Sequence, residues 1–284
     1  MKNRIISFFL ILLFVVGNYH KVSSEEFIFE SDYIEIKNNG NNIVAKNGVK
    51  ITSNNKIEIT ADESFYNKLT LELLLKGNVV FIDPERAIKI LSEEATYDKS
   101  NEKILSKGKV TASLANNHTL YTENLEYFRK DKIIQSKFKS ILTDKFNNKV
   151  IAENFNYSDS DKIFRGNNIE MMDENKNSYF FKKSIINLNK DVLLAKDVEI
   201  KFAKDTFGNT DNDPRLKGNA LSFSKNETII KNGVFTSCKI NDTCPPWSLR
   251  SSEIRHDKIK KTINYKDAVL QLYDKPVFYF PKFF

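Results

Sequence analysis

The sequence is poor in the residues on which catalysis and metal binding most often depend. Its 284 residues include 3 histidines, 2 cysteines and 1 tryptophan, and only His118 and His256 follow residue 24. It contains no Gly-x-Ser-x-Gly, no His-Glu-x-x-His and no phosphate-binding loop motif. We therefore expect no enzyme, no catalytic residue, no metal site and no cofactor.

Long apolar runs are also scarce. The run from Ile5 to Val16 follows Lys2 and Arg4 and precedes Val22-Ser23-Ser24. This order is typical of a signal peptide, whereas a membrane-spanning helix needs roughly 20 apolar residues. Residues 1–24 are therefore predicted to be a signal peptide, with an uncleaved N-terminal anchor as the alternative. The mature chain is expected to be exported.

The charge balance is only mildly basic. The formal net charge is +7, and three positive charges, Lys2, Arg4 and Lys21, lie within residues 1–24, which leaves +4. Such an excess, on an exported chain, disfavours nucleic acid as a partner and is compatible with anionic lipid head groups. The abundance of lysine is interpreted here as a compositional bias of the source.

A short phrase recurs about every thirty residues: a small residue, an acid, any residue, an apolar residue, any residue, and an aromatic or aliphatic residue. Five clear copies start at Ser31, Ala61, Ser92, Thr122 and Ala152, and two looser copies end at Leu188 and Phe223. The closing residues are 30, 31, 30, 30, 31 and 35 residues apart. A constant period of this size indicates one supersecondary unit stacked on copies of itself.

Each unit predicts two strands. Apolar residues two apart, as in Leu125 and Tyr127, occupy one face of a strand. A polar turn and a second run follow, which often carries Gly or Asn before a branched residue, as in Gly108-Lys109-Val110. We therefore predict an all-β fold, an elongated antiparallel β-jelly-roll of about seven stacked units of about 30 residues.

The recurring inward residues are the candidate site. In a stack whose two layers splay apart, they would line an apolar groove for a long lipid; in a generic sandwich they would be core. The groove prediction comprises Tyr66, Ala95, Tyr97, Leu125, Tyr127, Phe155, Tyr157, Leu188 and Phe223. The acids at positions 32, 62, 93, 123 and 153 fall in successive layers, which favours solvated positions over a metal site.

Four motifs near the end of the chain carry a family resemblance. They are Asn232-Gly233-Val234-Phe235-Thr236-Ser237-Cys238, Cys244-Pro245-Pro246-Trp247, Ser252-Glu253-Ile254-Arg255-His256-Asp257 and Pro276-Val277-Phe278-Tyr279-Phe280-Pro281. In order and spacing they resemble the outer-membrane lipopolysaccharide-assembly family LptD, also called organic solvent tolerance proteins. The thirty-residue repeats resemble the OstA-like domain that this family shares with LptA and LptC.

The resemblance implies a periplasmic β-jelly-roll, or β-taco, over residues 25–275, whose apolar groove carries lipid A on the periplasmic side of the outer membrane of a Gram-negative cell. It implies an LptA-type bridge protein as partner at the N-terminal strand edge, near Phe27 to Ile36. An LptE-type lipoprotein and a barrel are implied for a full-length protein. Residues 276–284, with Pro276 and Pro281, would form the junction to that barrel, which is missing because the sequence stops at Phe284.

The two cysteines lie close to this junction. Cys238 and Cys244 are expected to be oxidised after export, in a local loop or in bridges to cysteines elsewhere. In the family that the chain resembles, cysteines near the end of this domain form disulfides that matter for maturation; Cys238 matches best and Cys244 resembles a second one.

Three functions stay open from the sequence. The first is a periplasmic lipopolysaccharide-binding and transfer module of the outer-membrane assembly machinery. The second is a free bridge protein like LptA or LptC, which leaves the four C-terminal motifs unexplained. The third is a β-stack with a purely structural role.

Overall fold

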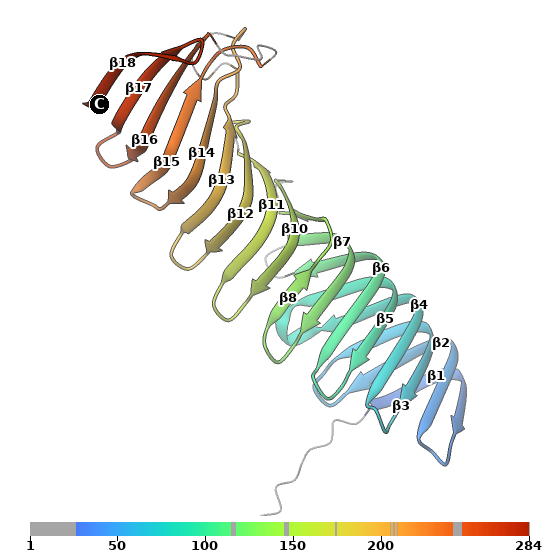
Figure 1. Cartoon of the computed structure of the whole chain (residues 1–284). Helices are drawn as coiled ribbons and strands as arrows, with labels where there is room; N and C mark the ends of the chain where they lie inside the picture. The colour runs from blue at the N-terminus through green and yellow to red at the C-terminus, as the bar shows by residue number, and fades with distance from the viewer. Residues whose placement is uncertain are drawn as a thin grey trace, which may run out of the picture.

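The computed structural model describes residues 27–283, except 115–117, 145–147, 174, 205, 207, 209 and 241–245. The predicted signal peptide, residues 1–24, lies outside the described residues. Within them, eighteen antiparallel strands form one long sheet, which runs as a twisted staircase from β1 to β18 (Figure 1). The predicted all-β, elongated jelly-roll is confirmed.

The strands have similar lengths because each unit repeats the same pattern. They are β1 (Phe27–Lys37), β2 (Asn42–Ser53), β3 (Glu58–Asn67), β4 (Glu72–Asp83), β5 (Ile88–Asp98), β6 (Lys103–Leu114), β7 (His118–Phe128), β8 (Ile133–Ser136), β9 (Ser140–Thr143), β10 (Lys149–Ser158), β11 (Ile163–Met172), β12 (Ser178–Asn187), β13 (Val192–Lys201), β14 (Arg215–Phe223), β15 (Glu227–Thr236), β16 (Trp247–Asp257), β17 (Thr262–Leu272) and β18 (Lys275–Phe283). A single 3₁₀ turn, η1 (Pro84–Arg86), joins β4 to β5.

Each strand pairs with the next one along the chain. β8 and β9 together take the place of one interrupted strand, since both pair with β7 and with β10. Within the described residues β1 pairs only with β2 and β18 only with β17, so these two are the edge strands. The copies of the recurring phrase fall on alternate strands, and β16 carries a further stretch in the same register, Ser251 to His256, with Ser252 at the position of the acid.

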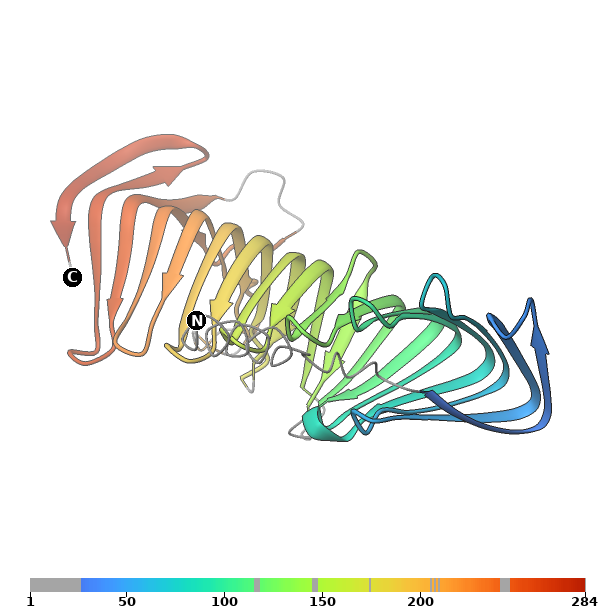
Figure 2. The same ribbon diagram turned by 90° about the horizontal axis from the view of Figure 1, so that it is seen from below.

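A line of β-bulges bends the sheet along its middle. The register shifts where the recurring acid faces the Gly or Asn of the next strand, as between β5 and β6 and between β10 and β11. There the second strand takes positive φ, 87° at Gly108 and 45° at Asn168. Such residues tolerate this conformation, and a bulge kinks its strand. We call the line of these Gly and Asn positions, along which the sheet bends, the crease. Figure 2 shows the strands curling, most strongly at the N-terminal end.

The recurring acids close the outer side of this crease. A Cβ atom at Gly108 would lie 2.6 Å from Glu93 Oε2, so the carboxylate occupies the space that only glycine leaves. Asn168 Nδ2 donates a hydrogen bond to Glu153 Oε2 over 2.7 Å. The acids therefore lie in successive layers on the outside, as expected, and in addition they fasten one strand to the next.

Candidate functional site

The bend places two rows of inward side chains opposite each other. We call the hairpin turns that follow β1, β3, β5, β7, β10, β12, β14 and β16 the first edge, and the remaining turns the second edge. The first inner row lies beside the first edge, and directly paired positions carry it across the sheet. It consists of Ile36, Ile43, Tyr66, Leu73, Tyr97, Ile104, Tyr127, Ile134, Tyr157, Phe164, Ile186, Leu193, Phe223, Thr228, His256 and Ile263.

The second inner row lies beside the second edge and consists entirely of apolar or aromatic residues. It is formed by Phe29, Ile51, Ile59, Phe81, Ile90, Ala112, Leu120, Leu142, Val150, Met171, Tyr179, Ile200, Leu216, Phe235, Leu249, Leu270 and Phe278. The inner face is thus apolar on this side from one end of the sheet to the other.

Most of the predicted groove residues occupy these positions. Tyr66, Tyr97, Tyr127, Tyr157 and Phe223 belong to the first inner row, whereas Ala95, Leu125 and Phe155 belong to the adjacent inward row nearer the crease. Leu188 does not belong to either row. Strand β12 ends at Asn187, Leu188 lies in the following turn, and Ile186 takes the row position. The loose copy of the phrase was therefore placed two residues too far along the chain.

Burial divides the first inner row into two parts. From Tyr66 to Ile134 every member is at most 5% exposed. From Tyr157 to Leu193 the members are half-buried, and Phe223 and Ile263 are 42% and 46% exposed. The predicted groove residues Ala95, Tyr97, Leu125 and Tyr127 therefore lie in a filled core, while Phe223 lies on an open surface. The same phrase thus serves two environments.

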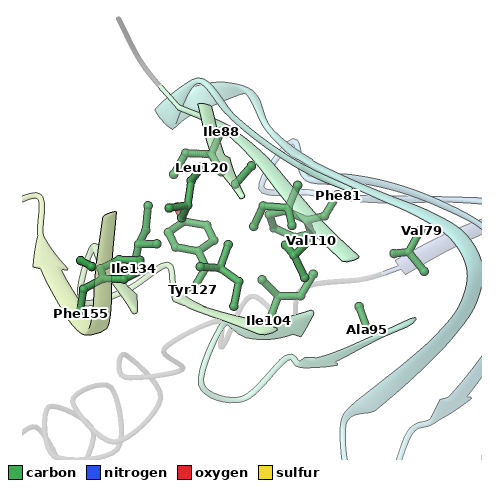
Figure 3. Close-up of a cluster of buried hydrophobic side chains, with 14 of the residues drawn as sticks. Val79, Phe81, Ile88, Ala95, Ile104, Val110, Leu120, Tyr127, Ile134 and Phe155 are labelled. Carbon is green, nitrogen blue, oxygen red and sulfur yellow. The ribbon is translucent and has the colours of Figure 1, made fainter. Parts of the chain in front are cut away.

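We call strands β1–β9 the N-terminal half. Aromatic side chains fill its interior. The Phe81 ring, from the second inner row, lies 6.1 Å from the Tyr97 ring and 6.2 Å from the Tyr127 ring, both of the first row. Figure 3 shows Phe81, Ile104 and Tyr127 within this cluster. Of the twelve largest fully buried side chains, only Ile169 belongs to β10–β18, the C-terminal half.

A buried ionic network joins the two edges in the N-terminal half. Arg129, on the first edge, donates from Nε to Asp83 (2.9 Å) and from Nη2 to Glu85 (2.8 Å), both on the second-edge side. Its Nη1 donates to Glu102 over 3.1 Å. Tyr127 donates its hydroxyl proton to the same Asp83 oxygen over 2.8 Å. We call this group of five residues the latch.

The electrostatics of the latch follow from its burial. Asp83 is fully buried, and the Arg129 side chain is 8% exposed. Burial alone would lower the pKa of Arg129, but its hydrogen bonds to Glu102 and Asp83 outweigh that effect and raise the pKa. Burial raises the pKa of the Tyr127 phenol, and the neighbouring Asp83 carboxylate raises the pKa further. Separating the two edges would leave the buried Asp83 carboxylate without its partners Arg129 and Tyr127, which is very costly. The latch therefore holds the two edges together.

The remaining predicted residues lie at the C-terminal end. The Cys238 Sγ atom lies 3.7 Å from the Trp247 carbonyl oxygen, and Cys238 forms no disulfide within the described residues. Cys244 lies outside the described residues, so the pairing of the two stays a prediction. Pro276 and Pro281 lie on edge strand β18, where a missing N–H is tolerated. Along the inner side of β18, Phe278 and Phe280 are exposed, and Phe283 stacks on Tyr265 at 4.5 Å.

Other potential sites are few among the described residues. They contain no group of three or more His, Cys, Asp or Glu side chains placed to hold a metal ion. No helix in the described ranges has the length and apolar character needed to cross a membrane. A hollow of about 610 Å³ on β10–β13 is lined by the cross-strand series Ile151, Glu170, Phe180 and Glu199, and it also reaches Met171 and Tyr179 of the second inner row.

No protein-family model matches the chain, and no curated protein matches it. Among solved structures, the chain is similar to LptH, the LptA-homologous periplasmic component of the lipopolysaccharide transport device of Pseudomonas aeruginosa, with 12% sequence identity and a TM-score of 0.33. The alignment covers 37% of this chain and 76% of LptH. At this TM-score the likeness carries no conclusion about the chain, and the fold is established by the strand pairing described above.

Proposed function

We propose that the chain is a periplasmic lipopolysaccharide-binding and transfer module of the outer-membrane assembly machinery. The observation that carries the proposal is the opening of the first inner row in the C-terminal half, where its members are half-buried from Tyr157 to Leu193 and exposed at Phe223 and Ile263. The four C-terminal motifs that resemble the LptD family add support. The chain acts by binding, without catalysis and without a cofactor.

The dimensions of the open face suit acyl chains. The C-terminal half has nine strands, and at a spacing of about 4.8 Å they extend over roughly 40 Å. That is longer than the roughly 30 Å hydrocarbon core of a bilayer. Acyl chains that bind on this face are removed from water along their length, while the head group stays at the edge of the face. The gain is roughly 25 cal/mol for each Å² of apolar surface covered.

The N-terminal half, whose interior is filled, has a different role in this proposal. Ala95, Tyr97, Leu125 and Tyr127 contact lipid only when the two edges separate, because their side chains fill the interior that a lipid would occupy. The latch therefore directs lipid first to the open half. The proposed course of transfer runs along the inner rows from one end of the sheet to the other.

The partners follow from the two edge strands. Among the described residues β1 pairs on one side only, and its Ile28 and Ile36 are more than half exposed. Such an edge adds a strand from another protein, and we assign it to an LptA-type bridge protein. A barrel and an LptE-type lipoprotein would meet the opposite end if the chain is part of a longer protein.

Photo-crosslinking from β13 and β14 tests the proposal. A photoreactive residue at Leu193 or Phe223 should capture lipopolysaccharide, because both belong to the first inner row. The controls are Leu194 and Ser222, the adjacent outward residues; Leu194 is itself 48% exposed and apolar, so it controls for hydrophobicity alone. Equal capture at inward and outward positions would refute lipid binding at this face and favour a structural β-stack.

A further inference from the structure

The lysines of this chain are not spread evenly over the sheet. The first-edge turns contain eleven basic residues, Lys68, Lys99, Arg129, Lys130, Lys132, Lys162, Lys190, Lys225, Lys258, Lys260 and Lys261, and five acidic ones, Glu102, Asp131, Asp159, Asp161 and Asp191. The described residues of the second-edge turns contain seven basic and six acidic residues. The excess of basic over acidic residues is therefore larger at the first edge than at the second.

The basic residues of the first edge have different surroundings in the two halves. In the N-terminal half several serve the structure itself: Arg129 forms the latch, Lys99 lies 4.9 Å from the Phe27 ring centroid, and Lys130 donates to the Ser100 carbonyl over 2.7 Å. In the C-terminal half four turn lysines are exposed and form no ion pair with any described residue. They are Lys190, Lys225, Lys260 and Lys261.

Lys258 connects these lysines to the open inner row. Its Nζ atom lies 3.4 Å from the centroid of the exposed Phe223 ring and donates to the Ser224 carbonyl over 2.7 Å. Burial lowers the pKa of Lys258. Its neighbour Asp257 is engaged elsewhere, since its Oδ1 accepts the backbone N–H groups of Ile259 and Lys260. A cation therefore stands directly beside the apolar surface, at its boundary with water.

We propose that Lys190, Lys225, Lys260 and Lys261 form a binding site for the phosphate groups of the amphiphile whose acyl chains lie on the open inner face. This site rests on the proposed function and adds the residues that recognise the head group. Successive first-edge turns are two strands apart, so the lysines recur at steps of roughly 10 Å along the first edge. Ammonium groups bind phosphate as point charges, and at this edge they meet a head group while the acyl chains stay inside.

The test compares two sets of four charge-neutralising substitutions in the full chain. The edge variant carries Lys190→Gln, Lys225→Gln, Lys260→Gln and Lys261→Gln. The control variant carries Lys182→Gln, Lys183→Gln, Lys196→Gln and Lys266→Gln, which remove four exposed lysines away from the turns. Affinity is measured for lipid A with its phosphate groups and for the same lipid after enzymatic dephosphorylation, with inorganic phosphate as a competitor.

The proposal predicts that the edge variant loses affinity for phosphorylated lipid A by at least about tenfold, which corresponds to about 1.4 kcal/mol, and that the control variant does not. Dephosphorylated lipid A should bind the unmodified chain and the edge variant equally. Inorganic phosphate should compete with phosphorylated lipid A only at millimolar concentrations. Equal binding of both lipid forms to the unmodified chain would overturn the phosphate site and leave the proposed function standing. Failure of both lipid forms to bind would overturn the proposed function itself.

Discussion

The two halves of this sheet share one sequence pattern but differ in how their edges meet. In the N-terminal half, Phe81, Tyr97 and Tyr127 fill the interior, and the latch fastens the first edge to the second. In the C-terminal half, the equivalent first-row positions include Phe223 and Ile263, which are open to solvent. The inner rows therefore form an apolar surface in both halves. Whether the two edges meet determines whether side chains of this chain or a ligand cover that surface.

The largest expected difference between the halves concerns Phe→Ala substitutions within the second inner row. Phe81→Ala should lower the free energy of unfolding by about 3–5 kcal/mol, because it leaves a cavity between the two rows. Phe278→Ala, at a position that is 61% exposed, should lower it by less than about 1 kcal/mol. Urea denaturation of both variants measures the two values. Similar costs would show that the C-terminal half is as tightly packed as the N-terminal half.

Removal of the latch should have the next largest effect. Arg129→Ala removes the cation that is hydrogen-bonded to the buried Asp83 and leaves only Arg86 Nε, at 3.7 Å, so it should cost about 3 kcal/mol. Lys130→Ala, one residue away and exposed, should cost less than about 1 kcal/mol. Adding Asp83→Asn to Arg129→Ala should restore part of the lost stability, because the buried carboxylate that has lost its hydrogen-bonded cation is then neutral. If the double variant is less stable than Arg129→Ala by the full cost of a second independent substitution, the two residues do not act as a latch.

The crease offers a smaller contrast between the halves. Gly108 has φ of 87° and is covered by Glu93, whereas Asn232 holds a positive φ of 50° at the crease of β15. Gly108→Asn should destabilise the fold by about 1–2 kcal/mol through overlap with that carboxylate, and Asn232→Gly should change stability by less than about 0.5 kcal/mol. Thermal unfolding of the two variants compares them, and an inert Gly108→Asn would show that the Glu93 side chain moves aside freely.

The smallest expected effect is a pH dependence at the first edge. Partial burial opposes ionisation of Asp98, but hydrogen bonds from Ser100 and Asn101 outweigh it and lower the pKa. A lowered pKa means that the stabilisation is present above the unfolded value, near 4, and is lost as pH falls through the folded value. Since the turn is exposed, Asp98→Asn should reduce the stability difference between pH 7 and pH 3 by less than about 0.5 kcal/mol. Urea midpoints at both pH values measure this, and an unchanged difference would exclude Asp98 as a contributor.

Much of the fold could be predicted from the sequence because the pattern is local. Alternation at Leu125 and Tyr127 fixes which side chains face inward, and the thirty-residue period fixes which strands carry them. The copy ending at Leu188 was misplaced because Ile186 and Leu188 are both apolar and two residues apart. The end of β12 at Asn187 decides between them, and the alternation itself does not mark that end.

The state of the groove could not be predicted, because it depends on contacts between distant residues. Arg129 and Asp83 are 46 residues apart, and nothing in either segment indicates that they meet. The first-edge lysines were equally hidden, since only the pairing of the strands places Lys190, Lys225 and Lys260 on one edge. The recurring Gly and Asn residues before branched residues are visible in the sequence. Because both residue types tolerate a positive φ, their recurrence is the signal that could have revealed the crease.

The most direct test of the central claim compares the same row in the two halves. Ile104→Cys and Leu193→Cys place one thiol each in the first inner row, in a background with Cys238→Ser and Cys244→Ser. Alkylation rates by a small maleimide are measured with and without lipopolysaccharide. We predict that Leu193→Cys reacts rapidly and is protected by lipopolysaccharide, whereas Ile104→Cys reacts only after denaturation. Equal rates at the two positions, or a fast Leu193→Cys that lipopolysaccharide does not slow, would contradict an open, lipid-binding C-terminal half.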